Sequence, residues 1–582
     1  MSTAPTAANP IPEDIDATRW ANVQPLFEEL TSREVRTQDE LERWLVDRGE
    51  LEAACSETQA NLYIAMTCDT ASADKKKAYT DFLENVSPKL RPARFELDKR
   101  QAELTDALGL DDARYGVLSR DTKAEVELFR DENVPLLTEI DKTEQRYTET
   151  VGNMTVEFDG EEKTLPQMNV YLQETDRDVR ERAWRLTAER RLQDADAIDG
   201  IYDELLDLRH KVATNAGFEN YVGYAFESMH RFDYTPEDCK AFHDAVAGVV
   251  VPFKRRLDED RRQKLGVDPL RPWDLNVDVK GRAPLKPFTN GADMVAKSQA
   301  AFQKIDPRLA EMFATLGDGT NASGPADGAK LDLDSRKGKA PGGYQYMRDR
   351  IREPFIFMNA TGLHRDVETM VHEAGHAFHS MQCKDEPLLH YRHSPIEFAE
   401  VASMSMELLS MPHWGGSDGF YPDAADHARA SRQQLESSIS MLAWIATIDA
   451  FQHRIYSNPG HDRDQRTAWW LELDERFGHA VSWDGLDKER AWLWQRQLHL
   501  FSHPFYYIEY GIAQLGSLQL WLRSQEEGEA VAVDAYLDAL ALGGSKPLPQ
   551  LFEAAGARLD FSVDMIKRLT DRVEAELAKL PE

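Results

Sequence analysis

Two histidines four residues apart, with a glutamate directly after the first, are the residues of this sequence best suited to chemistry. The segment VETMVHEAGHAFHSM (367–381) carries them as His372, Glu373 and His376. On a helix this spacing places both imidazoles on one face, one turn apart, where they can bind the same cation. Imidazole is a common zinc ligand, and a neighbouring carboxylate can take a proton from water that the ion has acidified. We therefore predict one Zn2+ per chain, with Glu373 as the acid/base.

The residues around this motif have the spacing of an amphipathic or buried helix. Apolar side chains recur every three or four positions from Val367 to Met381, which places them on one helical face. Asp366, directly before them, is a residue type that often caps the first turn. Two imidazoles and a carboxylate are costly to bury without a partner. The pattern therefore favours a metal site over a chance match.

A catalytic zinc ion usually takes a third protein ligand, and two residues compete for that position. His379 follows His376 by three residues, but three ligands on one straight helix rarely close a tetrahedron. Glu400 lies on a second apolar segment, in one stripe with Ser403 and Glu407. We prefer Glu400 as the third ligand and expect Glu407 to orient a ligand imidazole.

The second segment, SPIEFAEVASMSMELL (394–409), also begins like a helix. Ser394 is a candidate N-cap, Pro395 suits the first helical position, and Glu397 completes a capping box. We therefore assign Glu397 to capping and keep Glu400 for the metal.

Three separated motifs now resemble a known group of enzymes. HEAGHAFH (372–379), FAEVASMSMELL (398–409) and RQLHLFSHPFYYIEYGIAQ (496–514) occur in the order seen in the thimet oligopeptidase and oligoendopeptidase F family of zinc metallopeptidases. The resemblance runs from about residue 170 to near residue 575 and is nearer to the oligoendopeptidase F branch. It implies a mainly α fold, a two-lobed helical ellipsoid with a deep substrate channel and a few short strands near the active site.

The family pattern can be carried over to individual positions. His372, His376 and Glu400 match its metal ligands, and Glu373 matches its catalytic acid/base.

The last motif supplies further candidates. Tyr507 and Tyr510 match the family's paired tyrosines, and His499 matches its upstream histidine. The gap after His499 is about one residue shorter than in the thimet branch, so Tyr506 is a rival to Tyr507. If Pro504 begins a helix, Tyr507 and Tyr510 point the same way. Their hydroxyls could donate to the oxyanion of a tetrahedral intermediate.

A glycine-rich loop resembles the family segment that borders the substrate, at Gly342, Gly343 and Tyr344. Its sequence, KGKAPGGY (337–344), lacks the lysine-serine or lysine-threonine ending of a phosphate-binding loop. We therefore expect a peptide contact there and no nucleotide site.

The length of the chain and the changes in composition along it suggest two regions. A chain of 582 residues is longer than one hydrophobic core usually serves. Residues 1–150 read as an N-terminal helical region, and residues 151–582 as the catalytic region. The latter includes a section rich in loops and strands at about 266–360, within which 318–346 reads as loop with short strands. A hairpin is expected at 154–165, turning at Asp159-Gly160.

Composition excludes several other classes of protein. The net charge of −33, without a basic patch, disfavours nucleic-acid binding. No apolar stretch is long enough for a membrane helix, and the N-terminus lacks the pattern of a secretory signal. The four cysteines show no CxxC spacing, which suits reduced residues in the cytoplasm. The oligomeric state is not indicated.

These expectations combine into one function and two alternatives. We expect a zinc-dependent oligoendopeptidase that hydrolyses internal bonds of short unstructured peptides. The first alternative is an exopeptidase of the same fold that releases C-terminal dipeptides. The second is a non-catalytic peptide-binding protein that keeps a vestigial zinc site.

Overall fold

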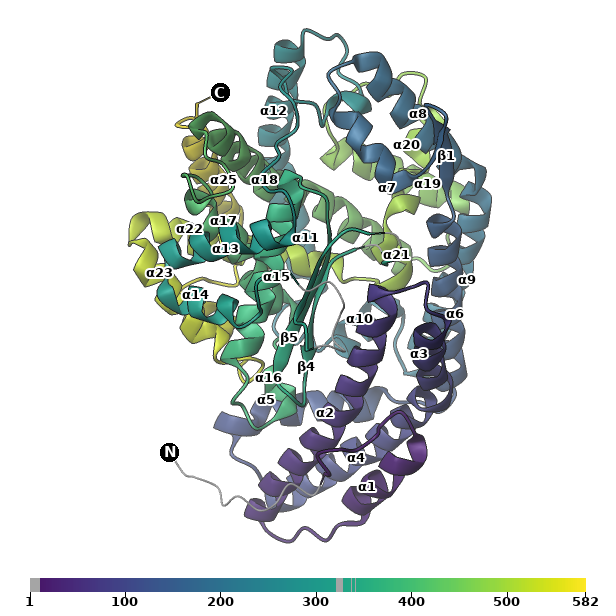
Figure 1. Ribbon diagram of the computed structural model, residues 1–582. Coiled ribbons are helices and arrows are strands. Elements are labelled where there is room, and N and C mark those ends of the chain that lie inside the picture. The colour runs from purple at the N-terminus through teal and green to yellow at the C-terminus, as the bar shows by residue number, and fades with distance from the viewer. Residues whose placement is uncertain (1–10, 321–327, 337, 341, 582) are drawn as a thin grey trace.

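The computed structural model describes residues 11–320, 328–336, 338–340 and 342–581. The fold is mainly helical, with a few short strands, and has two lobes (Figure 1). This confirms the predicted fold class. The segment 318–346, predicted as loop with short strands, falls partly outside the described residues, and its described part contains one short strand at Leu331–Asp334 and the start of another at Tyr344. Among the described residues, no helix combines the length and apolarity needed to cross a membrane.

The N-terminal helices form a hydrophobic core of their own. Its buried side chains include Phe27, Trp44, Leu97 and Leu118, joined by Tyr391 from later in the chain. Side chains of Thr37, Ser72 and Asp111 cap three of these helices, as their residue types favour. The helices of this part are α1 (Trp20–Ser32), α2 (Gln38–Cys68), α3 (Ala73–Asn85), α4 (Ser87–Leu108), α5 (Asp112–Leu128) and α6 (Asn133–Gly152).

The predicted hairpin follows. Strands β1 (Thr155–Phe158) and β2 (Glu161–Thr164) pair antiparallel. Between them Asp159 and Gly160 have φ values of 53° and 82°, the positive angles of a type I′ turn. The hairpin prediction is confirmed.

Helices then continue to residue 265. They are α7 (Leu165–Met168), η1 (Asn169–Gln173), α8 (Arg177–Gln193), α9 (Ala195–Asn215), α10 (Tyr221–Ser228), α11 (Pro236–Ala245), η2 (Val246–Val250) and α12 (Val251–Leu265). The short η2 is a π-helical turn within the otherwise continuous run from α11 to α12.

A three-stranded sheet lies between the lobes, with strand order β3-β5-β4. The central strand β5 (Glu353–Ala360) is parallel to β3 (Leu331–Asp334) and antiparallel to β4 (Tyr344–Arg348). Its apolar run is buried because α15 covers one side, while α2 contacts β4. Two helices, α13 (Gly291–Ile305) and α14 (Pro307–Ala314), precede the sheet.

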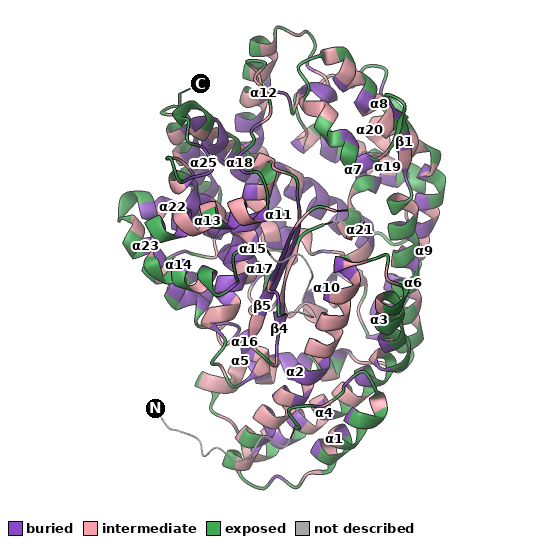
Figure 2. Ribbon diagram, viewed as in Figure 1, coloured by how far each residue is buried: buried purple, intermediate pink, exposed green. Residues whose placement is uncertain are grey.

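The C-terminal half supplies the helices around the predicted site. These are α15 (His364–Gln382), α16 (Leu389–Arg392), α17 (Ile396–Ser410), η5 (Met411–His413), α18 (Ala424–Tyr456), α19 (Arg463–Phe477), α20 (Asp487–Ala491), η6 (Leu493–Arg496), α21 (Leu498–Ser502), α22 (Tyr507–Glu526), α23 (Glu529–Leu540), α24 (Leu548–Ala554) and α25 (Val563–Leu577). Helix α17 lies between α15 and α22. Figure 2 shows it among the most buried elements, in contrast to α3.

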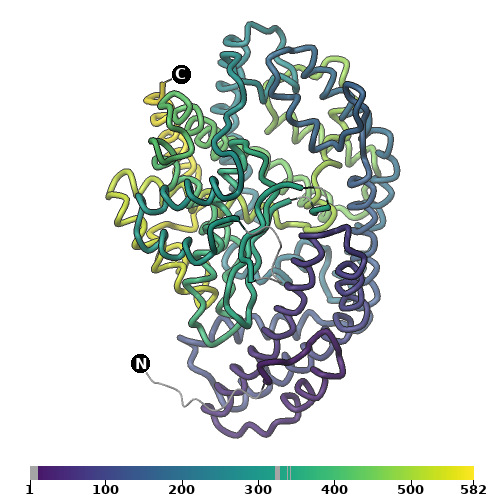
Figure 3. Tube along the Cα trace, viewed as in Figure 1, coloured from purple at the N-terminus to yellow at the C-terminus, as the bar shows by residue number. Residues whose placement is uncertain are grey.

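The two lobes do not follow the order of the chain. Helix α20 packs on α8, and η6 on α9, although more than two hundred and fifty residues separate them in sequence. Figure 3 shows the same return, where the light-green segment lies beside the blue one. The chain therefore passes between the lobes more than once.

Candidate metal centre

Helix α15 carries the histidine pair and begins earlier than expected. Asp366 is not its N-cap, because the helix starts at His364. The carboxylate of Asp366 instead reaches back and accepts hydrogen bonds from the backbone N–H groups of Leu363 and Thr361, at 2.9 and 2.8 Å. A carboxylate at the third helical position can satisfy these groups as well as an N-cap can. The capping prediction was therefore wrong in position.

The two faces of α15 have different roles. Val367, Met370 and Val371 are fully buried in the main hydrophobic core. The other side presents His372 and His376, whose ring centroids are 4.9 Å apart. The apolar stripe thus fixes the rotation of the helix, and this rotation brings the two imidazoles together.

Helix α17 brings Glu400 to this pair. Its Oε2 lies 3.3 Å from His372 Nε2 and 3.7 Å from His376 Nε2. The donor atoms of all three residues fall within 4.8 Å of one another. The close approach depends on Gly375, because a Cβ there would lie 2.5 Å from the carbonyl oxygen of Ala402.

The start of α17 differs from the predicted capping box. Ser394 makes no cap, and Pro395 rather than Ser394 occupies the N-cap position. The Ser394 hydroxyl lies 3.0 Å from His379 Nε2. Glu397 is buried and accepts a hydrogen bond from the Tyr234 hydroxyl at 2.7 Å. Tertiary partners take both side chains away from the helix end.

Further side chains orient the three candidate ligands. Glu407 Oε1 lies 2.7 Å from His372 Nδ1, and Gln434 Nε2 donates to Glu407 Oε2 at 2.9 Å. The Ser403 hydroxyl donates to Glu400 Oε2 at 2.9 Å. Such outer contacts fix the tautomer and direction of metal-binding groups. Gln434 is a contact that we did not foresee from the sequence, since it comes from the distant helix α18.

The charges around this centre suit a cation. Burial disfavours the protonated form of His372, but Glu400 and Glu407 outweigh it and raise its pKa well above the usual value. Burial also opposes ionisation of Glu400, but His376 and His372 lower its pKa to about 2. Burial lowers the pKa of His376 to about 4. Glu400 therefore stays negative beside the neutral imidazole of His376, and together with His372 they form a donor set that matches zinc.

Glu373 lies beside the ligands and is almost completely buried. Burial raises its pKa to about 7, with His372 opposing this and Glu400 adding to it. The backbone N–H of Gln345, in strand β4, contacts the Glu373 carboxylate. The sheet thus holds this side chain close to the histidine pair. A carboxyl group with a pKa near neutrality can both take up and release a proton.

His379 does not join the candidate ligands. Its ring is buried, and its Nε2 lies against the Ser394 hydroxyl. Burial lowers its pKa to about 3. The alternative of three histidines on one helix therefore lacks support from the geometry.

The tyrosines lie on a turn that differs from the expected helix start. Pro504 does not begin a helix, because α22 starts at Tyr507 and Phe505 adopts a left-handed φ of 66°. This turn carries Tyr506 toward the metal centre, where its hydroxyl donates to Glu400 Oε1 at 3.3 Å. The ring of Tyr510 lies 5.2 Å from that of Tyr506.

Tyr507 faces a different set of residues. Its hydroxyl lies by Trp444 and Gln497, and its ring is 4.9 Å from that of His499. The pair that shares the side of Glu400 is therefore Tyr506 and Tyr510.

The neighbours of His499 determine which of its two ring nitrogens carries the proton. The Trp444 indole N–H can only donate, and it lies 3.0 Å from Gln497 Oε1. The other end of that amide, Nε2, must then donate to His499 Nδ1, at 2.8 Å. The ring proton of a neutral His499 is therefore on Nε2. Burial lowers the pKa of His499 to about 4, so the ring stays neutral near pH 7.

The glycine-rich segment lies close to α15. A Cβ at Gly343 would meet Thr369 Cγ2 at 3.3 Å. The Tyr344 ring stacks on Phe357 at 4.8 Å, and its hydroxyl lies 2.6 Å from Thr67 Oγ1 in α2. Gly342 accepts a hydrogen bond from the Asn359 side chain at 2.9 Å. The Tyr344 hydroxyl is thus directed to the N-terminal helices.

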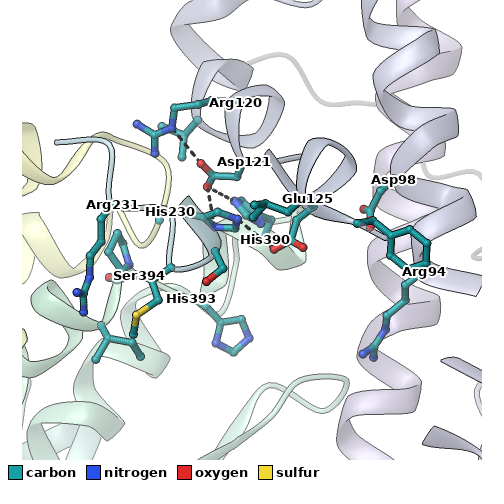
Figure 4. A pocket seen from close by; sticks show the side chains of 18 of the residues that line it. Arg94, Asp98, Arg120, Asp121, Glu125, His230, Arg231, His390, His393 and Ser394 are labelled. Atoms are coloured by element: carbon teal, nitrogen blue, oxygen red, sulfur yellow. Dashed lines mark hydrogen bonds and ion pairs between the residues drawn. The ribbon is translucent and has the colours of Figure 1, made fainter. Parts of the chain in front are cut away.

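A cavity of about 970 Å³ lies at the beginning of α17. Its wall includes Ser394 and Glu397, one helical turn before Glu400, and it contains none of the predicted site residues. Figure 4 shows its charged lining, in which Asp121 lies between Arg120 and His390. The cavity therefore adjoins the helix that carries Glu400 without including the histidine pair.

The chain is similar to several known peptidases. The sequence profile of Peptidase family M3 matches residues 170–571. An oligoendopeptidase F homolog of Borreliella burgdorferi is 27% identical over 207 residues, 34% of each protein. Oligopeptidase PepF of Bacillus subtilis is 23% identical over 342 residues, 57% of this chain and 48% of the relative. The chain thus spans about a third and about half of the length of these relatives.

Solved structures match over nearly the whole chain. Pz peptidase A, in complex with an inhibitor, has a TM-score of 0.84 and 26% identity, covering 96% of both chains. A structure from Bacillus anthracis described as an oligoendopeptidase F has a TM-score of 0.82 and 25% identity, covering 97% of both chains.

Proposed function

The chain belongs to Peptidase family M3, and from this premise we propose that it is a zinc-dependent oligoendopeptidase acting on short unstructured peptides. The observation that carries the proposal is the convergence of His372, His376 and Glu400, whose donor atoms lie within 4.8 Å of one another. Glu373 lies beside them in a buried position. The four buried free cysteines support a reducing compartment, and we propose the cytoplasm.

The metal would be held by His372, His376 and Glu400. A zinc ion bound there would polarise the scissile carbonyl and acidify a water molecule. Glu373 takes a proton from the attacking water, because its carboxylate lies beside the ligands and its pKa is raised to about 7 by burial. The same group then returns the proton to the leaving amine. Glu407 keeps His372 Nε2 directed at the centre by holding Nδ1.

Hydrogen-bond donors near Glu400 would stabilise the developing oxyanion. Tyr506, directly before α22, and Tyr510, in its first turn, are the tyrosines on that side. His499 presents an N–H at Nε2, since Gln497 occupies its Nδ1. Donors that are already oriented in a buried site contribute strongly to catalysis. We propose that Tyr507 supports His499 from the opposite side, and that Gly342, Gly343 and Tyr344 border the peptide.

The proposal is tested by replacing the acid/base. Glu373→Gln keeps the size of the side chain but cannot accept the proton, so cleavage of an internally quenched peptide should fall below a few per cent. Zinc content should stay unchanged, because Glu373 is not among the proposed ligands. Glu311→Gln, on the exposed surface of α14, is the matched control. Activity that persists in the Glu373 variant with zinc bound would contradict the mechanism.

Two alternatives are separated by the choice of substrate. A peptide blocked at both ends can be cut by an endopeptidase, whereas an exopeptidase that releases C-terminal dipeptides needs the free carboxylate. Internal cleavage of the blocked peptide therefore supports the proposal. Zinc binding without cleavage of either the blocked or the free peptide would favour a peptide-binding protein.

A further inference from the structure

A second group of metal-binding side chains is buried between α11 and α18. Helix α11 carries Cys239 and His243, and helix α18 carries Asp449 and His453. Each pair has the four-residue spacing that places both side chains on one face of a helix. The two helices are in contact, so the two pairs face each other. This is the same geometric device that brings His372 and His376 together.

Three of the four residues have ligand atoms at the separations of a metal site, and His243 adjoins them through Asp449. His243 Nε2 is 2.7 Å and His453 Nε2 is 3.4 Å from the same oxygen, Asp449 Oδ2. Ligand atoms of Cys239, Asp449 and His453 fall within 4.8 Å of one another. The proposed catalytic centre has a similar arrangement, with two histidine nitrogens 3.3 and 3.7 Å from one carboxylate oxygen.

Two polar atoms of this group lack a close hydrogen bond. Asp449 is fully buried, and His453 is 6% exposed. Among the described residues, nothing forms a hydrogen bond with Asp449 Oδ1, and His453 Nε2 has only the 3.4 Å ion-pair contact with Asp449 Oδ2. Buried polar atoms are nearly always satisfied, and each exception needs an explanation. Both atoms belong to side chains that converge on the same point, which a bound cation would fill.

We propose that Cys239, His243, Asp449 and His453 bind a second zinc ion with a structural role. Thiolate, imidazole and carboxylate ligands suit zinc, whereas magnesium and calcium prefer oxygen ligands alone. A thiolate and a carboxylate together balance the two positive charges of the ion. The resulting site is neutral, which permits deep burial.

The surroundings indicate a closed site. The His453 ring is flanked by Phe505 and Phe226, with ring centroids 5.2 and 6.1 Å away. Cys239 and Phe242 are fully buried as well. Four protein ligands within an aromatic shell leave no position for substrate or water, as in structural zinc sites. The group is therefore not a second catalytic centre.

The position of the group suggests what the ion stabilises. Gln452, next to His453, accepts a hydrogen bond from the backbone N–H of Phe505 at 2.6 Å. Phe505 is the residue with the left-handed backbone that turns Tyr506 toward Glu400. A metal ion that links α11 to α18 would stabilise the turn at Phe505, because Gln452 of α18 bonds to its backbone. The π-helical turn η2, which directly follows α11, is also of a kind often found beside functional sites.

Metal counting provides the first test, performed on the full chain after dialysis. We expect two zinc ions per wild-type chain and one in Cys239→Ser, with one also retained by His376→Ala. The double variant that combines Cys239→Ser with His376→Ala should therefore bind no zinc. The count in His376→Ala depends on the proposed catalytic centre, whereas the count in Cys239→Ser does not. Failure of either site is thus recognised separately.

Cobalt substitution gives the decisive readout, because a thiolate bound to Co2+ produces an intense near-ultraviolet charge-transfer band. The proposed catalytic ligands include no sulfur, so the band reports only on the second site. It should appear in the wild type and in His376→Ala, and disappear in Cys239→Ser. Cys68→Ser is the matched control, since Cys68 is also buried and should leave the band intact.

The alternative is a metal-free network of hydrogen bonds, in which Asp449 pairs with His243. In that case the wild type would bind metal only at the proposed catalytic centre of His372, His376 and Glu400. It would also lack the cobalt band, and either result overturns the proposal. If Cys239→Ser fails to fold, the wild-type spectrum and its persistence in His376→Ala still decide the question.

Discussion

At the scale of single residues, a histidine that is buried without charge makes a folded protein sensitive to acid. His379 is such a residue, because burial lowers its pKa to about 3. In the unfolded chain its pKa is near 6.5, so below this pH the unfolded state binds the extra proton and stability falls. The loss from this one group reaches about 2 kcal/mol between pH 6.5 and pH 5.

Replacement by a residue that does not titrate checks this argument. His379→Gln can still bond with Ser394, so its free energy of unfolding should decline less than that of the wild type over the same pH range. Urea unfolding at several pH values measures both slopes. Parallel slopes would show that other groups dominate acid unfolding.

The three tyrosines form a natural comparison set. Tyr506 and Tyr510 lie on the side of Glu400, whereas the Tyr507 hydroxyl lies by Trp444 and Gln497. We expect Tyr506→Phe and Tyr510→Phe each to lower kcat by roughly 10²-fold, the effect of losing one oxyanion donor. Tyr507→Phe serves as the control and should cost much less. Single-turnover rates distinguish the variants, and an ordering led by Tyr507 would contradict the assignment.

Glu407 gives a prediction about metal affinity. Glu407→Gln weakens the hold on His372 Nδ1, which is now 2.7 Å from the carboxylate. Loss of such a carboxylate typically lowers metal affinity by about 10- to 100-fold. Competition with a zinc chelator measures the change. Gln434→Met removes only the hydrogen bond to Glu407 and should lower zinc affinity less. Equal zinc affinities in the wild type and both variants would contradict the role of Glu407 in orienting His372.

These residues also show what the sequence could reveal. The motif spacing favoured Glu400 over His379 as the third ligand, since helical periodicity is a local property. The choice between Tyr506 and Tyr507 depends on the left-handed backbone of Phe505. Phenylalanine rarely adopts that conformation, so nothing in the residue types indicated the turn.

At the scale of elements, the centre depends on how closely α15 and α17 approach. Gly375 lies at their crossing, where a Cβ would be 2.5 Å from the Ala402 carbonyl oxygen. Gly375→Ala must push the helices apart, and we expect a loss of about 1–3 kcal/mol in the free energy of unfolding. Glu400 should move away from the histidines, so zinc affinity should fall as well.

A second glycine provides the control for this experiment. Gly116, in α5, has no atom closer than 3.8 Å to the place of a Cβ. Gly116→Ala should therefore leave zinc affinity unchanged and raise stability by about 0.5–1 kcal/mol, since alanine favours a helix interior. Thermal unfolding and chelator competition measure both effects. Unchanged zinc affinity in the Gly375 variant would contradict the packing argument.

Helix ends were harder to predict than helices. Asp366 and Ser394 are both good N-cap types, yet one acts from the third helical position and the other bonds with His379. Tertiary partners compete with local caps, and these partners are distant in sequence. The apolar periodicity of α15 and α17 was visible because burial on one face leaves a repeating pattern.

At the scale of the whole molecule, the hydrophobic cores suggest a boundary earlier than residue 150. The N-terminal core contains residues up to Leu118, whereas Ile140 and Tyr147, in α6, belong to the main core. We propose that the N-terminal helical region ends near Leu128. The sequence could not indicate this boundary, because α6 has the same charged, helical pattern as helices α1 to α5. Unlike them, it packs against α9.

The overall charge leads to a last prediction, about substrate preference. A net charge of −33 produces a negative field around the protein. Such a field attracts cationic ligands and speeds their association by about tenfold or more at low salt. A peptide with added lysines should therefore have a higher kcat/KM than the same peptide with added glutamates. Its kcat should be similar, because the added residues lie outside the cleaved bond.

Salt distinguishes this effect from specific contacts. Raising the ionic strength from about 0.01 M to about 1 M shortens the screening length from about 30 Å to about 3 Å, so the advantage of the cationic peptide should largely disappear. A neutral peptide of the same sequence controls for general effects of salt on the enzyme. If the advantage persists at high salt, individual acidic side chains must contact the lysines directly. Absence of any advantage at low salt would mean that the negative charge lies on faces remote from the path of the peptide.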